Sequence, residues 1–318
     1  MSALYLTEAD VTALIDMPGT IAVVEEAFRH LAVGEAENIP RVRTRARGII
    51  LHAMIASAGY LGYVGWKCYT TTRDAARFHV GLYDQTTGQM VALIEADQLG
   101  RLRTGATTGV ALRAMAPAES HELGLFGVGR QAETQVAAAA AVLPLRRAFI
   151  YSRSEERRTL FAEKMQMQLG IEVIPVDRPQ EAAEDLPIVI TATTSSTPVF
   201  DGATLAEGTI VCAVGANALS RAEIDTTTVR RADAIVCDSV QACRGEAGDF
   251  TEALEKGIYD WRRAVDLAEV VVGRASGKPR TGGVAIFKSV GLAVEDVAMA
   301  ARLLQLAKEQ KRGVALPF

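Results

Sequence analysis

A short apolar strand that runs into a glycine turn and an alanine-rich helix constrains this chain more than any other feature. Residues Leu123 to Gly127 form the expected strand, and Gln131 to Leu143 have helical character. The turn between them reads Gly127-Val128-Gly129-Arg130-Gln131-Ala132. Glycines let the backbone bend tightly and approach a pyrophosphate, whose charge the free N–H groups at the start of a helix can bind. Strand, turn and helix together predict a dinucleotide site rather than a structural turn alone.

Strands and helices alternate from Glu119 onward. A second strand is expected at Arg147 to Ser152 and a second helix at Glu155 to Leu169. Further apolar strands are expected at 188–193, 209–214 and 234–237. Such alternation is typical of a doubly wound parallel sheet. The predicted fold class is therefore α/β, with a Rossmann-type sheet in this part of the chain.

The N-terminal part of the chain has a different pattern. Residues 7–34 are expected to be helical, with Thr7 as the cap of the first helix. Apolar or alternating stretches at 49–55, 60–69, 78–83 and 90–95 are separated by turn residues, which predicts an antiparallel meander. Residues 294–310 are again helical, and we expect them to pack back on this part. We therefore predict an α+β domain from 1–118 with 296–318, and a dinucleotide-binding domain from 119–295.

The composition excludes several classes of partner. A net charge of −4 gives no reason to expect nucleic acid, and no apolar run approaches the roughly 20 residues that span a bilayer. The four cysteines (Cys68, Cys212, Cys237 and Cys243) lack Cys-x-x-Cys spacing, so neither a disulfide framework nor a metal site is predicted. We expect a cytoplasmic protein with reduced thiols that binds no nucleic acid, membrane or metal.

The ends of the second and third strands of the parallel sheet bear on the choice of cofactor. An acidic residue after the second strand usually binds the ribose of NAD, whereas this chain has Ser152 and Arg153 there. Arg153 could bind a 2′-phosphate or stack on the adenine, so NAD and NADP both stay open. Thr191-Ala192-Thr193 ends the third strand and is expected to line the cofactor, with a polar loop that binds no ligand as the alternative.

Three basic residues outside the parallel sheet are candidates for holding a substrate carboxylate. Arg41 follows Pro40 in an expected loop, and Arg103 lies in a polar passage just before a helix. Lys67 lies in an apolar strand, where a charge is costly unless it is paired. Forked donors such as arginine fix carboxylates well, although Arg41 could equally be a solvated surface side chain. Asn217 follows a strand of the parallel sheet and is either a hydrogen-bonding site residue or a plain turn residue.

At these motifs the sequence resembles the ornithine cyclodeaminase/μ-crystallin family, which also contains archaeal-type alanine dehydrogenases and several imino-acid reductases. The resemblance covers nearly the whole chain and includes the glycine turn. Its other motifs are Pro40-Arg41, Lys67, Leu102-Arg103-Thr104-Gly105-Ala106-Thr107, Thr191-Ala192-Thr193, Gly245-Glu246-Ala247-Gly248-Asp249 and the segment from Phe287 to Asp296.

The resemblance implies a homodimer whose substrate-binding and dimerisation domain is built from both ends of the chain. It also implies that Arg41, Lys67 and Arg103 hold a substrate carboxylate beside the nicotinamide, and that Ser289 to Gly291 close over the cofactor. The predicted cofactor-binding residues are Thr104, Gly127, Val128, Gly129, Arg130, Gln131, Ser152, Arg153, Thr191, Ala192, Thr193, Val214, Gly215 and Ser289.

One departure from the family pattern shapes the predicted activity. Cyclodeaminases carry an aspartate where this chain has Asn217, and an amide cannot accept a proton as a carboxylate does. We therefore predict reduction of a small α-imino acid to an L-amino acid by NADH or NADPH, with Lys67, or water, as proton donor. The catalytic set is then Lys67, Arg41, Arg103 and Asn217.

The substrate side chain is a finer prediction. Arg43, Arg45, Arg47 and His52 could serve a second carboxylate, which favours iminosuccinate and the product L-aspartate. The alternative is that these arginines simply face solvent. A cyclic ketimine reductase, an ornithine cyclodeaminase-like lyase and a dinucleotide-binding protein without catalysis stay open as other functions.

Overall fold

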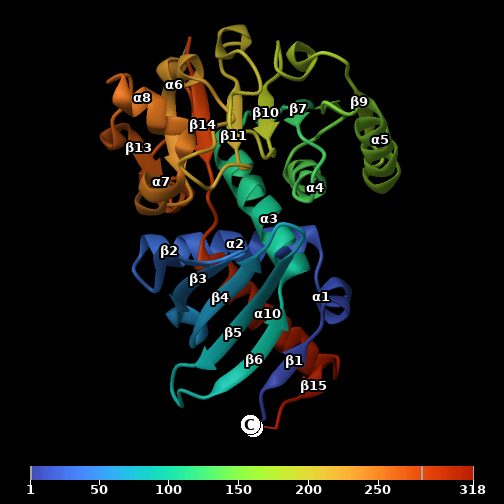
Figure 1. Ribbon diagram of the computed structural model, residues 1–318, viewed down its shortest axis with the longest axis vertical. Helices are drawn as coiled ribbons and strands as arrows, with labels where there is room; N and C mark the ends of the chain where they lie inside the picture. The colour runs from blue at the N-terminus through green and yellow to red at the C-terminus, as the bar shows by residue number, and fades with distance from the viewer. Residues whose placement is uncertain (1, 281, 318) are drawn as a thin grey trace. The chain divides into compact units, whose positions relative to one another are not determined.

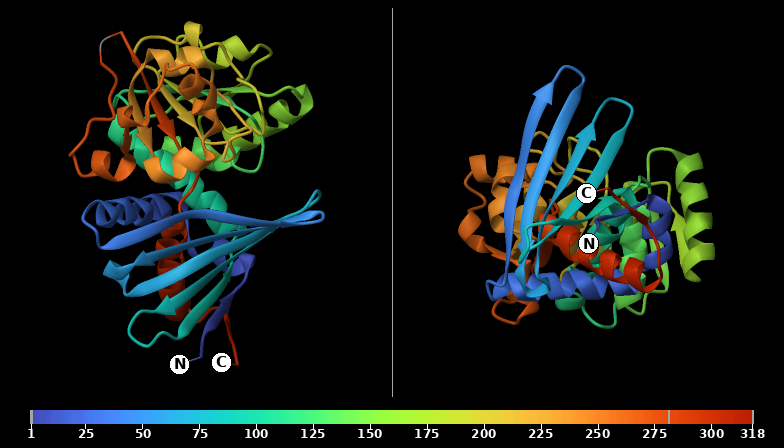
Figure 2. Two further views of the ribbon diagram at one scale, coloured as in Figure 1. Left: turned by 60° about the vertical axis from the view of Figure 1, so that its left-hand side comes forward. Right: turned by 90° about the horizontal axis from the view of Figure 1, so that it is seen from below.

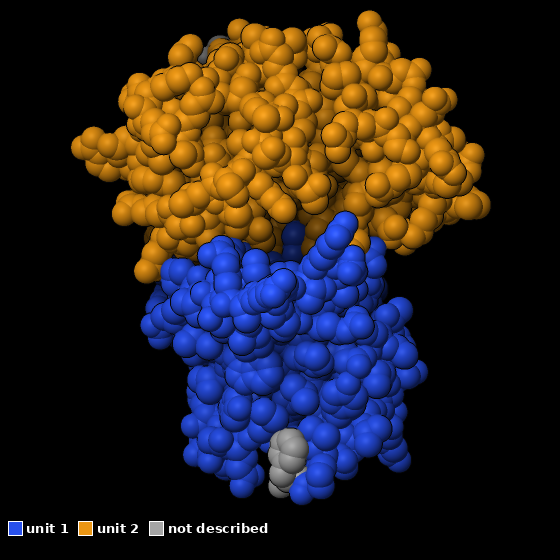
Figure 3. Space-filling view, viewed as in Figure 1, with its two compact units in different colours: residues 1–106, 291–318 blue, residues 107–290 orange. Residues whose placement is uncertain are grey.

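An eight-stranded parallel sheet and a seven-stranded mixed sheet form the cores of two units of this chain (Figures 1 and 3). The computed structural model describes residues 2–280 and 282–317. Unit 1 comprises residues 1–106 and 291–318, and unit 2 comprises residues 107–290. The expected boundaries were 118/119 and 295/296. The first division falls inside one continuous helix, α3 (Asp97–Met115), which no change of sequence character marks.

The sheet of unit 2 is parallel throughout, with strand order β13-β12-β14-β11-β10-β7-β8-β9. The predicted fold class is confirmed. The strands are β7 (Glu122–Phe126), β8 (Arg147–Tyr151), β9 (Glu172–Pro175), β10 (Ile188–Thr191), β11 (Ile210–Ala213), β12 (Ala232–Cys237), β13 (Ala264–Asp266) and β14 (Val284–Lys288). The helices are α4 (Ala132–Val142), α5 (Glu155–Leu169), α6 (Thr226–Arg231), α7 (Val240–Glu246), α8 (Thr251–Glu255) and α9 (Leu267–Val271).

The strand order of this sheet reverses between β7 and β10. From β7 the chain moves outward through β8 and β9, then returns to place β10 on the opposite side of β7. Open α/β sheets bind their ligands beyond the carboxyl ends of the strands at such a reversal. The turn after β7 and the loop after β10 are therefore the two segments of unit 2 placed to receive a ligand.

The sheet of unit 1 contains the predicted meander. Strands β3 (Ile49–Ala58), β4 (Tyr63–Thr71), β5 (Ala76–Asp84) and β6 (Met90–Glu95) pair antiparallel in chain order, and β2 (Ala36–Ala46) extends them at one edge. At the other edge, β1 (Leu4–Leu6) runs parallel to β6 and pairs with β15 (Val314–Ala315) near the end of the chain.

Helix α10 (Ala293–Glu309) covers one face of this sheet, as Figure 2 shows. It contacts β2 to β6 and also α2 (Met17–Ala32). Most of its side chains are buried, including Glu295 and Asp296 in its first turn. The prediction that residues 294–310 pack back on the N-terminal part of the chain is confirmed.

Side-chain carboxylates and a hydroxyl fix the beginnings of α1 and α3 in unit 1. Thr7 caps α1 (Glu8–Leu14) as predicted, because its hydroxyl accepts the Asp10 N–H while the Asp10 carboxylate accepts the Thr7 N–H. The Glu8 carboxylate in turn accepts the N–H groups of Asp97 and Gln98 and so begins α3.

Of the helices in the described part of the chain, none has both the length and the apolarity to cross a membrane.

Two sequence-based placements are wrong. Arg41 lies in β2 rather than in a loop. Because β2 is the edge strand, Pro40 can lack its N–H there, and the pairing of β2 with β3 shifts register between Ile39 and Val42. Arg103 lies inside α3 rather than before a helix. This helix lacks an apolar period because it buries polar side chains, Arg103 and three threonines among them.

Candidate active site

The first turn of α10 joins two of the predicted catalytic cations of unit 1. Lys67 Nζ, on β4, donates to Asp296 Oδ1 over 2.7 Å, and Arg103 Nε, on α3, lies 3.2 Å from the same oxygen. Arg103 also donates from Nη1 to Glu295 Oε2 over 2.8 Å. Both carboxylates are fully buried and both cations nearly so. The structure therefore brings Lys67 and Arg103 together around Asp296.

Arg41 reaches this cluster from β2 through Gly291. Its Nη2 lies 3.4 Å from the Gly291 carbonyl oxygen, and its guanidinium carbon lies 5.9 Å from the centre of the Tyr69 ring. Gly291 has a φ of +83°, and an added Cβ would lie 2.7 Å from Arg103 Nη1. Glycine is required at 291 both by its left-handed backbone and by the closeness of Arg103. The three predicted catalytic cations of unit 1 thus share one neighbourhood.

Charged side chains lie close together in this cluster. Lys67 and Arg103 both form ion pairs with Asp296, and Arg41 adds a further cation nearby. Burial lowers the pKa of Lys67 to about 8, although the carboxylate of Asp296 opposes that shift. Gly100 leaves room for the ammonium, since an added Cβ there would lie 2.9 Å from Lys67 Nζ. The result is a buried lysine that releases its proton far more readily than an exposed one.

A second cross-strand row of side chains lies on the face of the sheet that carries Lys67, two residues along each strand from the row of Lys67. Register places Arg43, His52, Tyr69 and Phe78 opposite one another, next to the row that contains Met54 and Lys67. Arg43 Nε donates to His52 Nδ1 over 3.2 Å, and the His52 ring stacks on Tyr69 at 4.1 Å between centroids. Burial and the neighbouring arginines lower the pKa of His52 to about 4, so His52 is neutral at physiological pH. The positive charge in this row is therefore carried by Arg43.

In unit 2, the glycine turn fits a group that approaches its backbone closely. Gly127 has a φ of +100°, and an added Cβ there would lie 2.6 Å from the Ala192 carbonyl oxygen after β10. At Gly129 an added Cβ would meet no atom of the described residues within 4 Å, which leaves open space beside the turn. The buried Thr191 hydroxyl at the end of β10 has no hydrogen-bond partner among the described residues. These features at the reversal of strand order fit a pyrophosphate.

Several predicted cofactor residues already use their polar groups within unit 2. Thr193 donates both its N–H and its hydroxyl to Glu223, and Ser289 donates its hydroxyl to Asp238. The Ser152 carbonyl oxygen accepts from Arg158 Nη1. The hydroxyl protons of Thr193 and Ser289 are therefore already used by carboxylates of unit 2.

The remaining predicted residues lie at ends of strands or in a helix. The predicted cofactor residues Val128, Arg130 and Gln131 complete the turn before α4, Arg153 is exposed after β8, and Val214 and Gly215 follow β11. Asn217 is half-buried two residues further on. Thr104 lies in α3, in unit 1, where its hydroxyl donates to the Gly100 carbonyl oxygen over 2.7 Å.

Sequence reasoning assigned no role to Glu295 or Asp296. The available signal was a pair of acidic residues at the start of a predicted buried helix, where isolated charges are costly.

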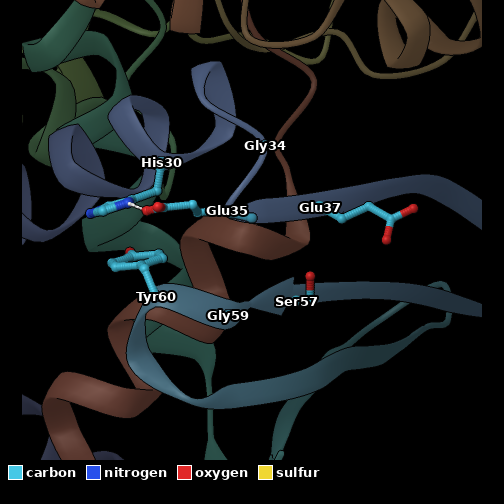
Figure 4. Close-up of a pocket in the computed structure, with 8 residues that line it drawn as sticks. His30, Gly34, Glu35, Glu37, Ser57, Gly59 and Tyr60 are labelled. Carbon is cyan, nitrogen blue, oxygen red and sulfur yellow. Dashed lines mark hydrogen bonds and ion pairs between the residues drawn. The ribbon is translucent and has the colours of Figure 1, made fainter.

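A separate surface pocket in unit 1 includes His30, Glu35 and Tyr60 in its lining (Figure 4). His30 hydrogen-bonds to Glu35 over 2.6 Å and stacks on Tyr60. None of the predicted site residues lines this pocket.

Replacing Asp296 by asparagine tests the cluster. Asp296→Asn leaves Lys67 and Arg103 buried with one carboxylate fewer, so we expect the free energy of unfolding to fall by about 3–5 kcal/mol. Glu309→Gln changes an exposed carboxylate of the same helix and should cost less than about 0.5 kcal/mol. Urea unfolding of both variants measures the difference, and equal effects would contradict a structural role for the ion pairs.

Known proteins resemble this chain over most of its length. A Δ1-pyrroline-2-carboxylate reductase from Bacillus cereus is 32% identical over 240 residues, which are 75% of this chain and 74% of the relative. The structure of the Thermococcus litoralis Δ1-pyrroline-2-carboxylate reductase in complex with NADH and L-proline has a TM-score of 0.93 and 31% identity, covering 98% of this chain and 100% of that one. An archaeal alanine dehydrogenase dimer with bound NAD has a TM-score of 0.93 and 29% identity, with both chains fully covered.

The family relationship extends from the first residue to the last helix. The sequence model of the ornithine cyclodeaminase/mu-crystallin family matches residues 1–311. This range includes every motif that carries the resemblance, together with the residues of the buried cluster of unit 1. The chain belongs to the ornithine cyclodeaminase/mu-crystallin family, as its motifs predicted.

Proposed function

We propose that this chain reduces the C=N bond of a small α-imino acid to an L-amino acid with NADH or NADPH. The observation that carries the proposal is the buried cluster around Asp296, with a guanidinium held by two carboxylates and a readily deprotonated lysine. The relatives named above supply independent support, since they are imino-acid reductases and an amino-acid dehydrogenase.

The arginines of the cluster suit the α-carboxylate of the substrate. Two nitrogens of the Arg103 guanidinium are held by Glu295 and Asp296, which fixes its plane before a ligand arrives. A preorganised guanidinium binds a carboxylate with little loss of side-chain entropy. Arg41 adds a second cation from β2. These two residues would fix the imino acid by its carboxylate and so orient its α-carbon.

Lys67 suits the nitrogen of the imine. Its ammonium can donate a hydrogen bond to the imine nitrogen and give up a proton as that nitrogen becomes an amine. A pKa of about 8 keeps Lys67 largely protonated at neutral pH, yet makes the proton easier to transfer than that of an ordinary lysine. Asp296 holds the ammonium in place throughout.

The glycine turn of unit 2 would hold the dinucleotide by its pyrophosphate, and residues 191–193 and 214–215 would line it. When bound, the reduced nicotinamide supplies the hydride that the α-carbon receives. The end of β8 carries Ser152 and Arg153 and no carboxylate, so both NADH and NADPH belong in the first assays. Within this proposal, Asn217 is a neutral hydrogen-bonding group of the loop that follows β11.

Iminosuccinate is the substrate that the second row of side chains favours. Cross-strand rows two residues apart are separated by about 7 Å along the strands, a span that the two carboxylates of a four-carbon diacid can bridge. Arg43 carries the charge of that row, next to neutral His52. The product would be L-aspartate.

A cyclic ketimine is the second candidate. Δ1-Pyrroline-2-carboxylate is the substrate in the names of the Bacillus cereus and Thermococcus litoralis relatives, both just over 30% identical to this chain. The stacked rings of Tyr69 and Phe78, 4.9 Å apart, offer a flat apolar surface near Lys67 that suits a small ring.

Oxidation of NADH and NADPH distinguishes these functions. The assay pairs ammonia with oxaloacetate, pyruvate or glyoxylate, and tests Δ1-pyrroline-2-carboxylate alone. Net consumption of reduced cofactor with at least one substrate is expected. Ornithine turnover without net change of cofactor would instead indicate a cyclodeaminase-like lyase, and cofactor binding without any turnover a binding protein.

Arg43→Ala tests the dicarboxylate. Loss of a charge-assisted hydrogen bond is worth about 1.5–3 kcal/mol, so we expect KM for iminosuccinate, formed from oxaloacetate and ammonia, to rise between about tenfold and a hundredfold. KM for a monocarboxylic imine should change less than about twofold. Arg73→Ala removes an exposed arginine beyond β4 and serves as the control. If both substrates lose affinity alike, Arg43 does not bind a second carboxylate.

We also propose that unit 1 forms a homodimer through the face of its sheet opposite α10. That face exposes large apolar side chains on three neighbouring strands: Ile39, Val42, Leu51, Ile55 and Val64. Val42 is 62% exposed and Ile55 53%, and contiguous apolar surface of this kind is typical of an interface. The similar archaeal alanine dehydrogenase is a dimer.

A charge in the centre of that face should separate the subunits. Ile55 lies between Ile39 and Trp66 in the register of the sheet, so Ile55→Asp would bury a carboxylate among apolar groups of a dimer. Light scattering should give twice the chain mass for the native protein and one chain mass for the variant. Met167→Asp, at an 83% exposed position of α5, should stay dimeric. A native monomer would contradict the proposal.

A further inference from the structure

One buried carboxylate of unit 2 binds the loops that follow two neighbouring strands. Glu223 is fully buried, and its Oε1 accepts the N–H of Thr193 over 2.6 Å and the Thr193 hydroxyl over 2.8 Å. Its Oε2 accepts the N–H groups of Gly215 and Ala216 over 2.7 and 3.1 Å. Thr193 follows β10 and Gly215 follows β11, at the carboxyl edge of the sheet (Figure 1).

A second carboxylate and a lysine hold Glu223 itself. Asp249 Oδ1 accepts the N–H groups of Glu223 and Ile224 over 2.6 and 3.3 Å. Its Oδ2 forms an ion pair of 2.7 Å with Lys288 Nζ at the end of β14. Burial raises the pKa of Glu223, while the nearby Lys288 ammonium opposes that shift. Lys288 also donates to the Ala216 carbonyl oxygen over 2.6 Å, so Ala216 is held through both its N–H and its carbonyl.

Backbone packing leaves these loops little freedom. At Gly215, an added Cβ would lie 2.3 Å from the Thr193 carbonyl oxygen and 2.5 Å from Glu223 Oε1. At Gly248, an added Cβ would lie 2.7 Å from the Ala218 carbonyl oxygen. Asn217 therefore stands between Ala216, which Glu223 and Lys288 fix, and Ala218, which packs against Gly248.

We propose that Glu223 is a positioning residue that sets the shape of the cofactor loops at 193 and 214–217, and with it the place of Asn217. The inference rests on the proposed function, since these loops line the dinucleotide only in that account. The carboxylate suits the task because it accepts all four hydrogen bonds, whereas any side chain with a donor would repel at least one of them. Glu223 acts through Thr193, Gly215 and Ala216 and touches no reacting atom.

Glu223→Gln tests this role with almost unchanged volume. The amide NH2 must face N–H donors of one loop, so that loop loses its acceptor and shifts. We expect the Kd and KM of the reduced cofactor to rise at least tenfold, with KM for the imino acid changing less than about threefold, because its carboxylate binds in unit 1. Fluorescence of bound NADH and NADPH measures the Kd without turnover. Glu207→Gln, an exposed carboxylate of the same unit, should behave as the native protein does.

A purely structural role would give a different result. Partial unfolding lowers kcat in proportion to the folded fraction and leaves both KM values unchanged. Native cofactor Kd and KM in Glu223→Gln would overturn the proposal while the proposed function stands. If Glu223→Gln does not fold, Thr193→Val removes the hydroxyl bond to Glu223 and the acceptor of the Ser195 N–H, and should raise the cofactor Kd about threefold or more; no rise would overturn the proposal. A native protein that binds neither cofactor would overturn the proposed function and this inference together.

Discussion

The carboxylate of Asp296 is the group on which the structure of unit 1 depends. Asp296 lies in the first turn of α10, and it binds Lys67 of the meander and Arg103 of α3. Burying any one of these charges alone would cost several kcal/mol, so each is stable only because the others are present. Lys67 cannot stay in an apolar strand without Asp296, and Glu295 and Asp296 cannot stay on the buried face of α10 without Arg103 and Lys67. The same contacts hold α10, near the end of the chain, against β4 and α3.

Interactions that stabilise the unit also create its chemistry. Glu295 and Asp296 hold the Arg103 guanidinium in a fixed plane, and burial lowers the pKa of Lys67 to about 8. Unit 2 also contains buried charges: Lys288 forms an ion pair with Asp249 and lies close enough to Glu223 to oppose the rise in its pKa that burial causes. There the extra acceptors bind backbone N–H groups and fix loops rather than a substrate. Buried charges thus fix side chains in unit 1 and backbone loops in unit 2.

Features that depend on neighbouring residues were predictable from the sequence. The strand, glycine turn and α4 follow one another within about twenty residues, and the meander shows its alternation and turns locally. Partners far apart in the chain were not predictable. Asp296 lies 229 residues from Lys67 and 193 from Arg103 in the sequence, and no residue spacing within a motif indicates such pairs. Arg41 was misplaced because Pro40 marks a loop in most contexts but is tolerated in an edge strand. Arg103 was misplaced because α3 buries polar side chains, Arg103 and three threonines among them, and so lacks the apolar period of an amphipathic helix.

Direct titration of Lys67 tests the central claim, that the cluster holds a lysine able to release its proton near neutral pH. The chain has seven lysines, so 13C labelling at lysine Cε gives few signals, and Lys67→Met identifies the one from Lys67. We predict that this signal titrates with a pKa of about 8, while ordinary lysines titrate near 10.4. A Lys67 signal that titrates at the ordinary value would contradict the claim. It would leave Lys67 as a fixed charge and move the proton donor to water.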